Sequence, residues 1–295
     1  MIHENKLKGV YTALLTPFKN IEIDEKAFSN LIEKQVAAGI NGLVPCGSTG
    51  EAATLSADEH ISAIKLCIQI AAKRVPVMAS IGSNSTSKTI ELAQHAQKAG
   101  ADYLMAVAPY YNKPTPEGIY QHYKAINDAV DIPVIIYNIP GRSVINITDD
   151  TISRLAELKN IIGIKDATGD LERPLVLSSK LKKEFYQFSG EDSTALAFNI
   201  QGGIGCISVA SNIVPELCIK LQDLWFKRKI NEAQELNKRL LPLFKALFCE
   251  TNPAPVKYAA SLLDISSAEV RLPLVEINES SKGIIKQAMI DLGIL

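Results

Sequence analysis

The sequence lacks the features that mark several large classes of protein. Its five cysteines are widely spaced, form no C-x-x-C pair and are odd in number, so they give no closed disulfide framework. Reduced thiols inside a cell are the simplest interpretation. No apolar stretch approaches the length of a membrane span, and the first residues contain no apolar signal-peptide core. We therefore expect a cytoplasmic protein without a membrane partner.

Neither sign of charge dominates the chain. Its 31 Lys and Arg residues nearly balance 32 Asp and Glu residues, which gives a formal net charge of −1. The longest basic run, 227–229, lies beside a helical pattern and is interpreted as a solvated face. Balanced charge of this kind argues against nucleic acid as a partner.

Nucleotide and metal signatures are also missing. No G-x-G-x-x-G follows the first predicted strand, and no phosphate-binding loop of the Walker type is present. The four histidines show no H-E-x-x-H or other short ligand spacing. We therefore expect neither a metal nor a cofactor.

What the sequence does contain is a regular alternation of short apolar runs with longer amphipathic stretches. Strands are predicted at 9–15, 42–45, 75–80, 103–108, 133–138, 161–165, 185–189 and 205–209. Helices are predicted at 24–38, 56–72, 85–99, 116–129, 148–158, 215–226, 231–248, 253–263 and 278–292. Eight strands that alternate with helices predict a (β/α)8 TIM barrel, with a doubly wound open sheet as the alternative.

The chain is mostly helical after its eighth predicted strand. A barrel does not need this much additional helix, so we expect a C-terminal helical appendage. We place the barrel and its active site in residues 1–214 and the helical region in residues 215–295.

Lys165 ends the apolar run 161–164, so it is predicted to lie on a buried strand. A lysine is rarely buried without a reason, and desolvation favours the neutral amine that attacks carbonyl carbons. Schiff-base chemistry follows from this interpretation. The alternatives are a side chain that extends from the strand end to solvent, or a simple pair with Asp166.

In a (β/α)8 barrel the functional residues gather where the strands end. The polar residues that follow the predicted strands are Thr16, the turn 47–51, the segment 109–112 and the segment 137–142; Lys165 lies on the sixth strand, and the segment 203–208 leads into the eighth. A nucleophile, tyrosines, hydroxyls, a glycine turn and an arginine would thus meet at one mouth.

Three of these features have a specific chemical use and an ordinary alternative. The turn Gly47-Ser-Thr-Gly50 precedes a helix, so its N–H groups and hydroxyls suit a carboxylate, although it would also serve as a plain turn. Tyr137 offers a phenol that passes a proton, or is a core aromatic. Arg142, expected in a loop, suits a bidentate bond to a carboxylate, or is a surface residue.

The order and spacing of four motifs resemble the pyruvate-dependent class I aldolase family. They are Gly47-Ser-Thr-Gly-Glu51, Pro109-Tyr-Tyr-Asn112, Tyr137-Asn-Ile-Pro140 with Arg142, and Gly163-Ile-Lys-Asp-Ala-Thr-Gly169. The similarity runs from the segment 9–17 to the segments 252–257 and 271–273, so it covers nearly the whole chain.

The resemblance implies catalytic roles for four residues. Lys165 would form a Schiff base with pyruvate, and Tyr137 would relay protons to and from the carbonyl and the imine. Ser48 and Tyr111 would complete a hydroxyl relay with Tyr137. Family members are typically homotetramers built from tight dimers, in which the counterpart of Tyr111 reaches the neighbouring site.

The resemblance also implies substrate-binding roles. Ser48, Thr49 and neighbouring backbone amides would hold the pyruvate carboxylate, with Gly47 and Ile207 as further binding residues. Arg142 would hold the carboxylate of L-aspartate 4-semialdehyde. The expected reaction condenses these two substrates in the pathway to diaminopimelate and lysine.

Two positions depart from the family pattern. A Thr-Thr pair is common where this chain has Ser48-Thr49, so the relay hydroxyl is expected to be less restrained in rotamer. Lysine-sensitive members carry a histidine and a glutamate where Ala57 and Lys88 stand. His60, Asn84 and Tyr110 remain as possible allosteric residues, but a cationic Lys88 would repel the ammonium group of lysine. We expect weak or absent lysine inhibition.

Two other functions remain open from the sequence. One is a sister lyase that acts on N-acetylneuraminate or a 2-keto-3-deoxy sugar acid; it would share Lys165 and Tyr137 but would usually lack Arg142 in this loop. The other is a non-catalytic barrel that binds a keto acid. The complete set of site residues argues against lost catalysis.

Overall fold

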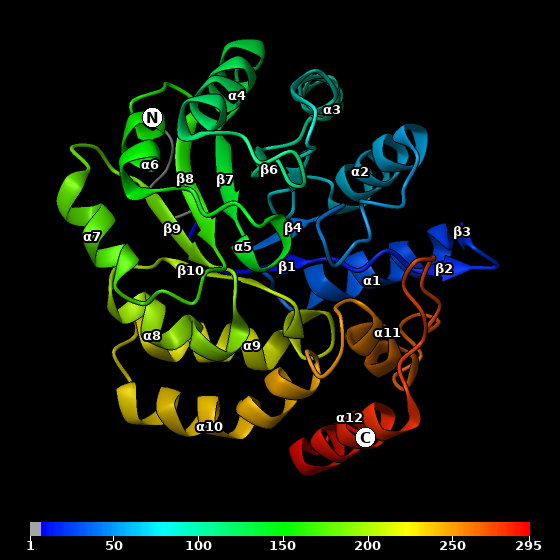
Figure 1. The fold of residues 1–295 in the computed structure, drawn as a ribbon. Helices are drawn as coiled ribbons and strands as arrows, with labels where there is room; N and C mark the ends of the chain where they lie inside the picture. Colours follow the sequence, from blue (N-terminus) through cyan, green and yellow to red (C-terminus); the bar gives the residue numbers. More distant parts are fainter. Residues whose placement is uncertain (1–6) are drawn as a thin grey trace. The chain divides into compact units, whose positions relative to one another are not determined.

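The structure is a computed structural model and describes residues 7–295. The described chain forms two compact units that are interleaved in sequence. The first contains residues 7–8 and 76–207, and the second contains residues 9–75 and 208–295. Figure 1 shows the chain coloured from the N-terminus to the C-terminus.

Six strands of the first unit pair in parallel, each with the next in sequence. They are β5 (Met78–Ser80), β6 (Tyr103–Val107), β7 (Val134–Asn138), β8 (Ile161–Asp166), β9 (Tyr186–Ser189) and β10 (Gly205–Ser208). Their residues are buried almost throughout, which is why they read as continuous apolar runs in the sequence.

Helices follow these strands within the first unit (Figure 1). They are α3 (Thr86–Ala99), α4 (Pro116–Ala129), α5 (Pro140–Ser143), α6 (Asp149–Ala156), α7 (Arg173–Lys180) and α8 (Ala195–Ile200). Ser85, Thr115 and Thr148 begin α3, α4 and α6, because each side chain accepts a hydrogen bond from the N–H group three residues later. The buried faces of α3 and α6 pack against β6 and β8.

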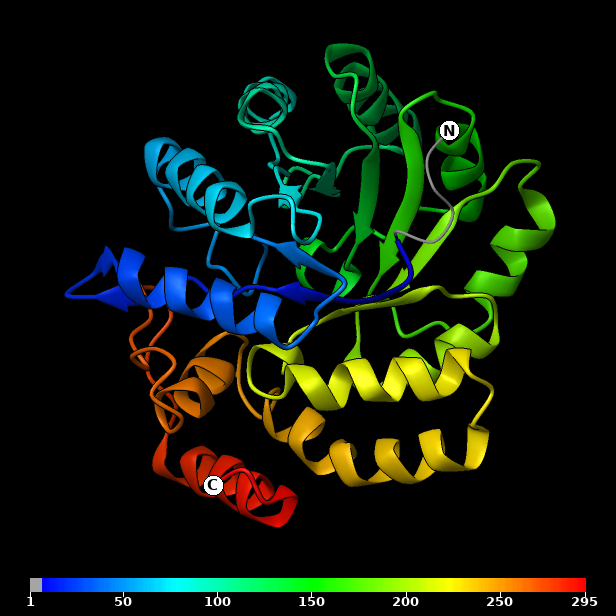
Figure 2. The same ribbon diagram turned by 180° about the vertical axis from the view of Figure 1, so that it is seen from behind.

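The second unit contains two parallel strands, a small hairpin and six longer helices. The strands β1 (Gly9–Ala13) and β4 (Gly42–Val44) pair in parallel, and β2 (Phe18–Lys19) and β3 (Glu22–Ile23) form the antiparallel hairpin. The helices are α1 (Glu25–Ala37), α2 (Ala57–Ala71), α9 (Pro215–Phe226), α10 (Ile230–Ala246), α11 (Ala254–Ser261) and α12 (Glu279–Leu292). Figure 2 shows α9 and α10 side by side, and α12 contacts α10.

All eight predicted strands are present, with ends that differ by a few residues. The hairpin over residues 18–23 and the helices α7 and α8 were not predicted individually, because segments this short carry too little periodicity. The domain boundary placed between residues 214 and 215 remains a prediction.

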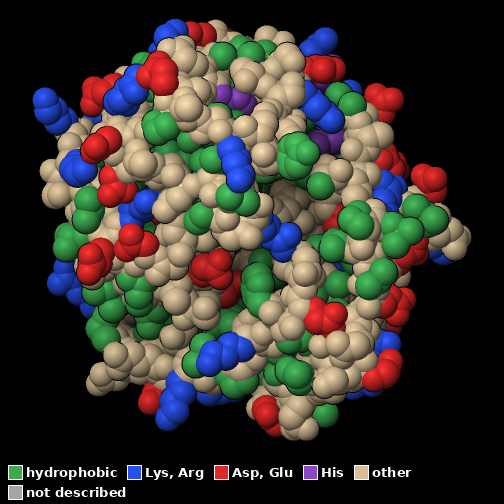
Figure 3. Space-filling view, viewed as in Figure 1, with side chains coloured by type: hydrophobic (Ala, Val, Ile, Leu, Met, Phe, Trp, Pro, Cys, Tyr) green, Lys and Arg blue, Asp and Glu red, His purple; other side chains and the backbone are tan. Residues whose placement is uncertain are grey.

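The exposed charges follow the balance seen in the composition. On the face shown in Figure 3, the basic and acidic side chains are interspersed, and neither kind gathers into one large patch. None of the helices within residues 7–295 combines the length and the apolar character that a membrane crossing requires.

Candidate active site

Tyr137 and Lys165 lie opposite each other on the paired strands β7 and β8. Their side chains are 4% and 5% exposed, respectively. The Nζ atom of Lys165 lies 4.1 Å from the centroid of the Tyr137 ring. The expectation that Lys165 is buried on a strand is confirmed, and its amine lies against the face of an aromatic ring that carries a phenol.

Gly163 explains how β8 comes so close to β9. A Cβ atom at this position would lie 2.3 Å from the backbone oxygen of Tyr186, so no larger residue fits without displacing the strand. Lys165 lies two residues further along β8, on the same face of the strand. The glycine therefore helps to fix the position from which the lysine side chain extends.

Arg142 does not lie in an irregular loop, as the sequence had suggested, but in the one-turn helix α5 that follows β7. Pro140 stands at the start of this turn, where its fixed φ suits a helix and its missing N–H group is not needed. Val144, with a positive φ of 66°, ends the turn. The Arg142 side chain is exposed.

Glu191 was not among the residues predicted for the site. It lies just beyond β9, where its N–H group donates to Ser189 Oγ at 3.1 Å and its carbonyl accepts from the same hydroxyl at 2.9 Å. Burial raises the pKa of the Glu191 carboxyl, while the charges of Lys165 and Arg142 act to lower it. A signal was present, because Gly190-Glu191 directly follows the predicted strand 185–189.

The segment around Tyr111 has an unusual backbone. Tyr111 has a φ of 73°, a left-handed conformation that is uncommon for a bulky residue, and its side chain is 87% exposed. Asn112 holds the segment to the start of α3, because its side chain donates to the carbonyl oxygen of Asn84 at 2.9 Å. Tyr110 is half-buried beside Tyr111.

Ile207 is fully buried on β10. Its side chain offers an apolar surface only, so any part in substrate binding would come through packing or through its backbone. The structure places it on the same sheet of the first unit as Tyr137 and Lys165, three strands beyond β7.

Gly47, Ser48 and Thr49 belong to the second unit. Their turn precedes a helix, as expected, but further turns lie between it and α2, which begins at Ala57. Among the described residues, no backbone carbonyl accepts the N–H groups of Ser48 or Thr49. These N–H groups can therefore serve a carboxylate even without a helix N-terminus behind them.

Two side chains from distant parts of the second unit brace this turn. Thr16 Oγ1 donates to the carbonyl oxygen of Gly50 at 2.8 Å. Asn252 Nδ2 donates to Thr49 Oγ1 at 3.1 Å. Thr49 is buried and Ser48 is half-buried, so the turn holds both hydroxyls on a fixed backbone.

A buried ion pair lies directly behind the turn. Lys257 Nζ is 2.5 Å from Glu51 Oε1, and both side chains are almost completely buried. The other carboxylate oxygen of Glu51 accepts from the N–H group of Arg271 at 2.9 Å. Desolvation lowers the pKa of Lys257 to about 8, although Glu51 opposes the shift. The pair fixes the C-terminal end of the turn against α11.

The residues with a possible part in lysine regulation lie on two helices and in two connecting segments. His60 is buried on α2, which begins at Ala57, and both belong to the second unit. Lys88 lies in the first turn of α3, and Asn84 and Tyr110 belong to the same first unit. An allosteric role for these residues remains a prediction.

Each unit thus holds a part of the predicted site. The first unit brings Tyr137 and Lys165 together and carries Arg142, Ile207 and Tyr111; the second carries the turn with Ser48 and Thr49. A relay that joins Ser48 to Tyr137 remains a prediction. Within residues 7–295 no three His, Cys, Asp or Glu side chains gather to suit a metal ion, and the expectation that none is needed also remains a prediction.

Comparison with known proteins decides the family. The model of the dihydrodipicolinate synthetase family matches residues 6–291. The chain belongs to this family. A 4-hydroxy-tetrahydrodipicolinate synthase of Bradyrhizobium diazoefficiens is 52% identical over 100% of both chains. The dihydrodipicolinate synthetase family contains enzymes of the class I aldolase type.

Solved structures of the same family confirm the fold class. The 4-hydroxy-tetrahydrodipicolinate synthase of Methylacidiphilum fumariolicum SolV has a TM-score of 0.96 at 41% identity, over 97% of this chain and 96% of that one. The dihydrodipicolinate synthase of Acinetobacter baumannii, complexed with pyruvate, has a TM-score of 0.95 at 42% identity, over 98% and 99% of the two chains. The fold is the predicted (β/α)8 barrel with C-terminal helices.

Proposed function

We propose that the protein is a 4-hydroxy-tetrahydrodipicolinate synthase, which condenses pyruvate with L-aspartate 4-semialdehyde through a Schiff base on Lys165. The observation that carries this proposal is the buried amine of Lys165 against the ring of Tyr137, in a chain of the dihydrodipicolinate synthetase family. The relatives that share about half of its residues carry the same enzyme name.

The proposed chemistry begins at the Lys165 amine. The neutral amine attacks the pyruvate carbonyl, water leaves, and an iminium forms that withdraws electrons from the neighbouring methyl group. Loss of a methyl proton gives an enamine, whose carbon attacks the aldehyde carbon of the second substrate. The amino group of that substrate then attacks the iminium carbon, the Lys165 amine leaves, and the heterocyclic product is released.

Each proton transfer needs a group close to the Lys165 nitrogen. The Tyr137 phenol is suited to this role, because the Tyr137 ring lies against the Lys165 nitrogen and the strands fix both residues. Ser48 would continue the relay, and the N–H groups of Ser48 and Thr49 would hold the pyruvate carboxylate, with Gly47 and Ile207 lining the substrate. Arg142 would hold the carboxylate of the semialdehyde by two parallel hydrogen bonds.

The exposure of Tyr111 bears on the quaternary structure. The Tyr111 side chain is 87% exposed on a left-handed backbone, so a neighbouring copy of the chain can reach it. We propose a homotetramer made of two dimers, in which Tyr111 completes the relay of a neighbouring copy. A cytoplasmic location, where the pathway to diaminopimelate and lysine would draw on the product, belongs to the same proposal.

The test is pyruvate consumption by the purified protein with three separate acceptors. These are L-aspartate 4-semialdehyde, N-acetylmannosamine and glyceraldehyde. Turnover with the semialdehyde alone is expected. Turnover with a sugar aldehyde alone would keep the Schiff base but move the protein to a sister lyase, and no turnover with any acceptor would favour a non-catalytic barrel.

A further inference from the structure

The two residues that follow the proposed catalytic pair also lie opposite each other. Asn138 comes directly after Tyr137 on β7, and Asp166 comes directly after Lys165 on β8; the strands place Asn138 against Asp166 in register. Successive residues of a strand point to opposite faces. Asn138 and Asp166 therefore point away from the face that carries Tyr137 and Lys165.

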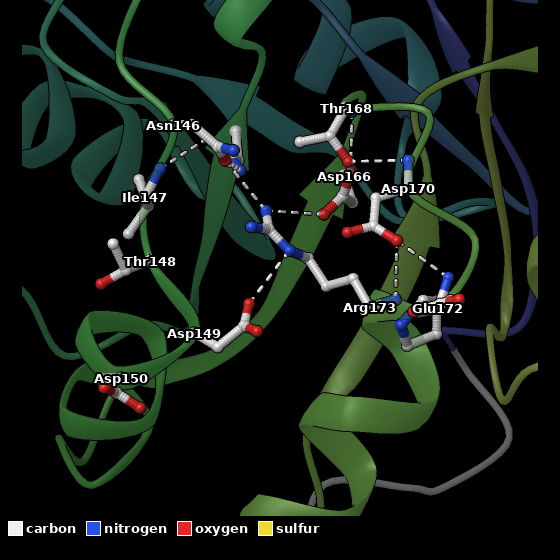
Figure 4. Close-up of polar contacts among 12 residues, drawn as sticks. Asn146, Ile147, Thr148, Asp149, Asp150, Asp166, Thr168, Asp170, Glu172 and Arg173 are labelled. Atoms are coloured by element: carbon white, nitrogen blue, oxygen red, sulfur yellow. Dashed lines mark hydrogen bonds and ion pairs between the residues drawn. The ribbon is translucent and has the colours of Figure 1, made fainter.

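A buried arginine reaches this second row of residues. Arg173, the first residue of α7, is 7% exposed. Its Nη1 atom donates to Asn146 Oδ1 at 3.1 Å and approaches Asp166 Oδ2 at 3.4 Å. Its Nε atom forms an ion pair with Asp149 Oδ1 at 3.1 Å, without the direction of a hydrogen bond. Figure 4 shows the Arg173 side chain between these three partners.

The partners of Arg173 belong to segments that carry proposed site residues. Asn146 Oδ1 also accepts from Asn138 Nδ2 at 3.0 Å, and Asn138 Oδ1 accepts from the N–H group of Ile147 at 3.2 Å. Residues 146–147 follow α5, the one-turn helix that carries Arg142. The guanidinium of Arg173 thus contacts both the end of the Lys165 strand and the residues that follow the Arg142 helix.

Asp166 is held from its other side as well. Its Oδ1 atom accepts from the N–H group and the hydroxyl of Thr168 at 2.8 and 2.6 Å, so its second oxygen is left for Arg173. The carboxylate is 3% exposed and is therefore a fixed anchor.

We propose that Arg173 is a positioning residue for the second substrate. Arg173 connects residues 146–147, which follow the Arg142 helix, to the end of β8. We call this connection the tie. It fixes the distance between the guanidinium of Arg142 and the amine of Lys165. This proposal rests on the proposed function, in which these two groups hold opposite ends of the reacting pair. Binding of pyruvate alone does not use Arg142, so it should not depend on the tie.

The guanidinium group, and not only its charge, is required for this role. Three contacts in different directions need the planar fork of an arginine, whereas a lysine ammonium at the end of a flexible chain meets one or two of them. Arg173→Lys keeps the positive charge beside Asp166 and Asp149 but loosens the tie. It therefore separates positioning from the loss of a buried charge.

The experiment compares steady-state kinetics of the full-length protein with Arg173→Lys. We expect kcat/KM for the semialdehyde to fall about tenfold, within the roughly hundredfold that a misplacement of ~1 Å can cost. The KM for pyruvate and the amount of pyruvate trapped on the protein by borohydride should stay unchanged. Equal changes for both substrates, or no change for either, would overturn the proposal.

Two further variants keep the test independent of folding. Asn146 is exposed, and Asn146→Ala removes the oxygen that accepts from both Arg173 and Asn138. This variant should also lower kcat/KM for the semialdehyde and leave the KM for pyruvate unchanged. Arg154→Lys alters an exposed ion pair with Glu117 in the same unit and should change neither substrate. If Arg154→Lys lowered kcat/KM for the semialdehyde alone, or if Asn146→Ala did not, the role proposed for Arg173 would be contradicted.

Hydrogen exchange tests the tie independently of the enzyme activity. The Ile147 N–H group, bonded to Asn138, should exchange faster with solvent in Arg173→Lys than in the unchanged protein. If the unchanged protein failed to turn over the semialdehyde, the proposed function would fall while this exchange still tested the tie. An unchanged exchange rate at Ile147 in Arg173→Lys would by itself contradict the tie.

Discussion

Lys165 and Tyr137 face each other across a parallel strand pair, with the lysine nitrogen 4.1 Å from the centre of the tyrosine ring. Both side chains are almost fully buried, so neither moves freely. The strand register, rather than a flexible loop, sets their separation. A pair fixed in this way suits the nucleophile and the proton donor that the proposed Schiff-base mechanism requires.

Replacing the phenol should slow proton transfer without preventing imine formation. For Tyr137→Phe we expect kcat to fall about 10²–10⁴-fold, the usual contribution of a positioned acid or base. The ring remains against the Lys165 nitrogen, so the packing should be retained. Steady-state kinetics with circular dichroism as a folding control provide the measurement. Near-normal turnover would show that Tyr137 does not relay protons.

The buried pair of Lys257 and Glu51 should be sensitive to the loss of one partner. Lys257→Met leaves the Glu51 carboxylate buried without its cation, which typically costs about 3–5 kcal/mol of unfolding free energy. The double variant with Glu51→Gln should recover part of this loss. Urea unfolding measures both changes.

An exposed ion pair of the same unit provides the control for Lys257. Lys227 lies 3.0 Å from Asp223 on a solvent-exposed face, and Lys227→Met should change the unfolding free energy by less than about 1 kcal/mol. If Lys257→Met were equally mild, the buried pair would not contribute to stability as its burial implies.

Glu59 should make stability depend on pH in the acid range. Hydrogen bonds from Arg271 lower the pKa of the Glu59 carboxyl from 4.5 to about 2. A carboxyl whose pKa is lower in the folded state stabilises the protein above the unfolded pKa, and this contribution is lost as pH falls from about 4.5 towards 2.

The variant Glu59→Gln isolates this contribution. Glutamine can still accept from the N–H group of Ser56, so the cap of α2 is kept while the charge is removed. Because the Glu59 side chain is partly exposed, we expect a deficit of only about 1 kcal/mol at pH 7. The deficit should shrink as pH is lowered in parallel urea titrations; a deficit that stays constant would exclude Glu59 as the titrating group.

Lysine should inhibit the enzyme weakly or not at all. Lys88 places a cation in the first turn of α3, where it would repel the ammonium of the ligand. Lys88→Glu should therefore lower the lysine concentration that halves the activity. Inhibition of the unchanged protein by sub-millimolar lysine, or no gain from the substitution, would contradict this role for Lys88.

The sequence was sufficient for the fold class, because eight strands are continuous apolar runs separated by helices with clear caps. It also placed Lys165 correctly, since a lone lysine at the end of an apolar run stands out. The one-turn helix of Arg142 was missed, because four residues carry no measurable period. The role assigned to each site residue remains a prediction.

The polar contacts between distant residues could not be predicted from the sequence, for a different reason. Lys257 contacts Glu51, and Asn252 contacts Thr49, across long separations along the chain, and neither pair lies within a single motif. Arg173 is close to Asp166 in sequence, but only the turn between β8 and α7 directs its side chain back to that carboxylate. Contacts of this kind depend on tertiary structure rather than on local pattern.

Trapping with borohydride in the presence of pyruvate tests the Schiff base most directly. Reduction of the imine leaves a carboxyethyl group on the nitrogen of the reacting lysine, and peptide mass spectrometry locates it. We predict a single modified residue, Lys165, and no modification in Lys165→Ala, which should also lack turnover. Modification of Lys257 or of no lysine, or activity retained by Lys165→Ala, would contradict the proposed mechanism.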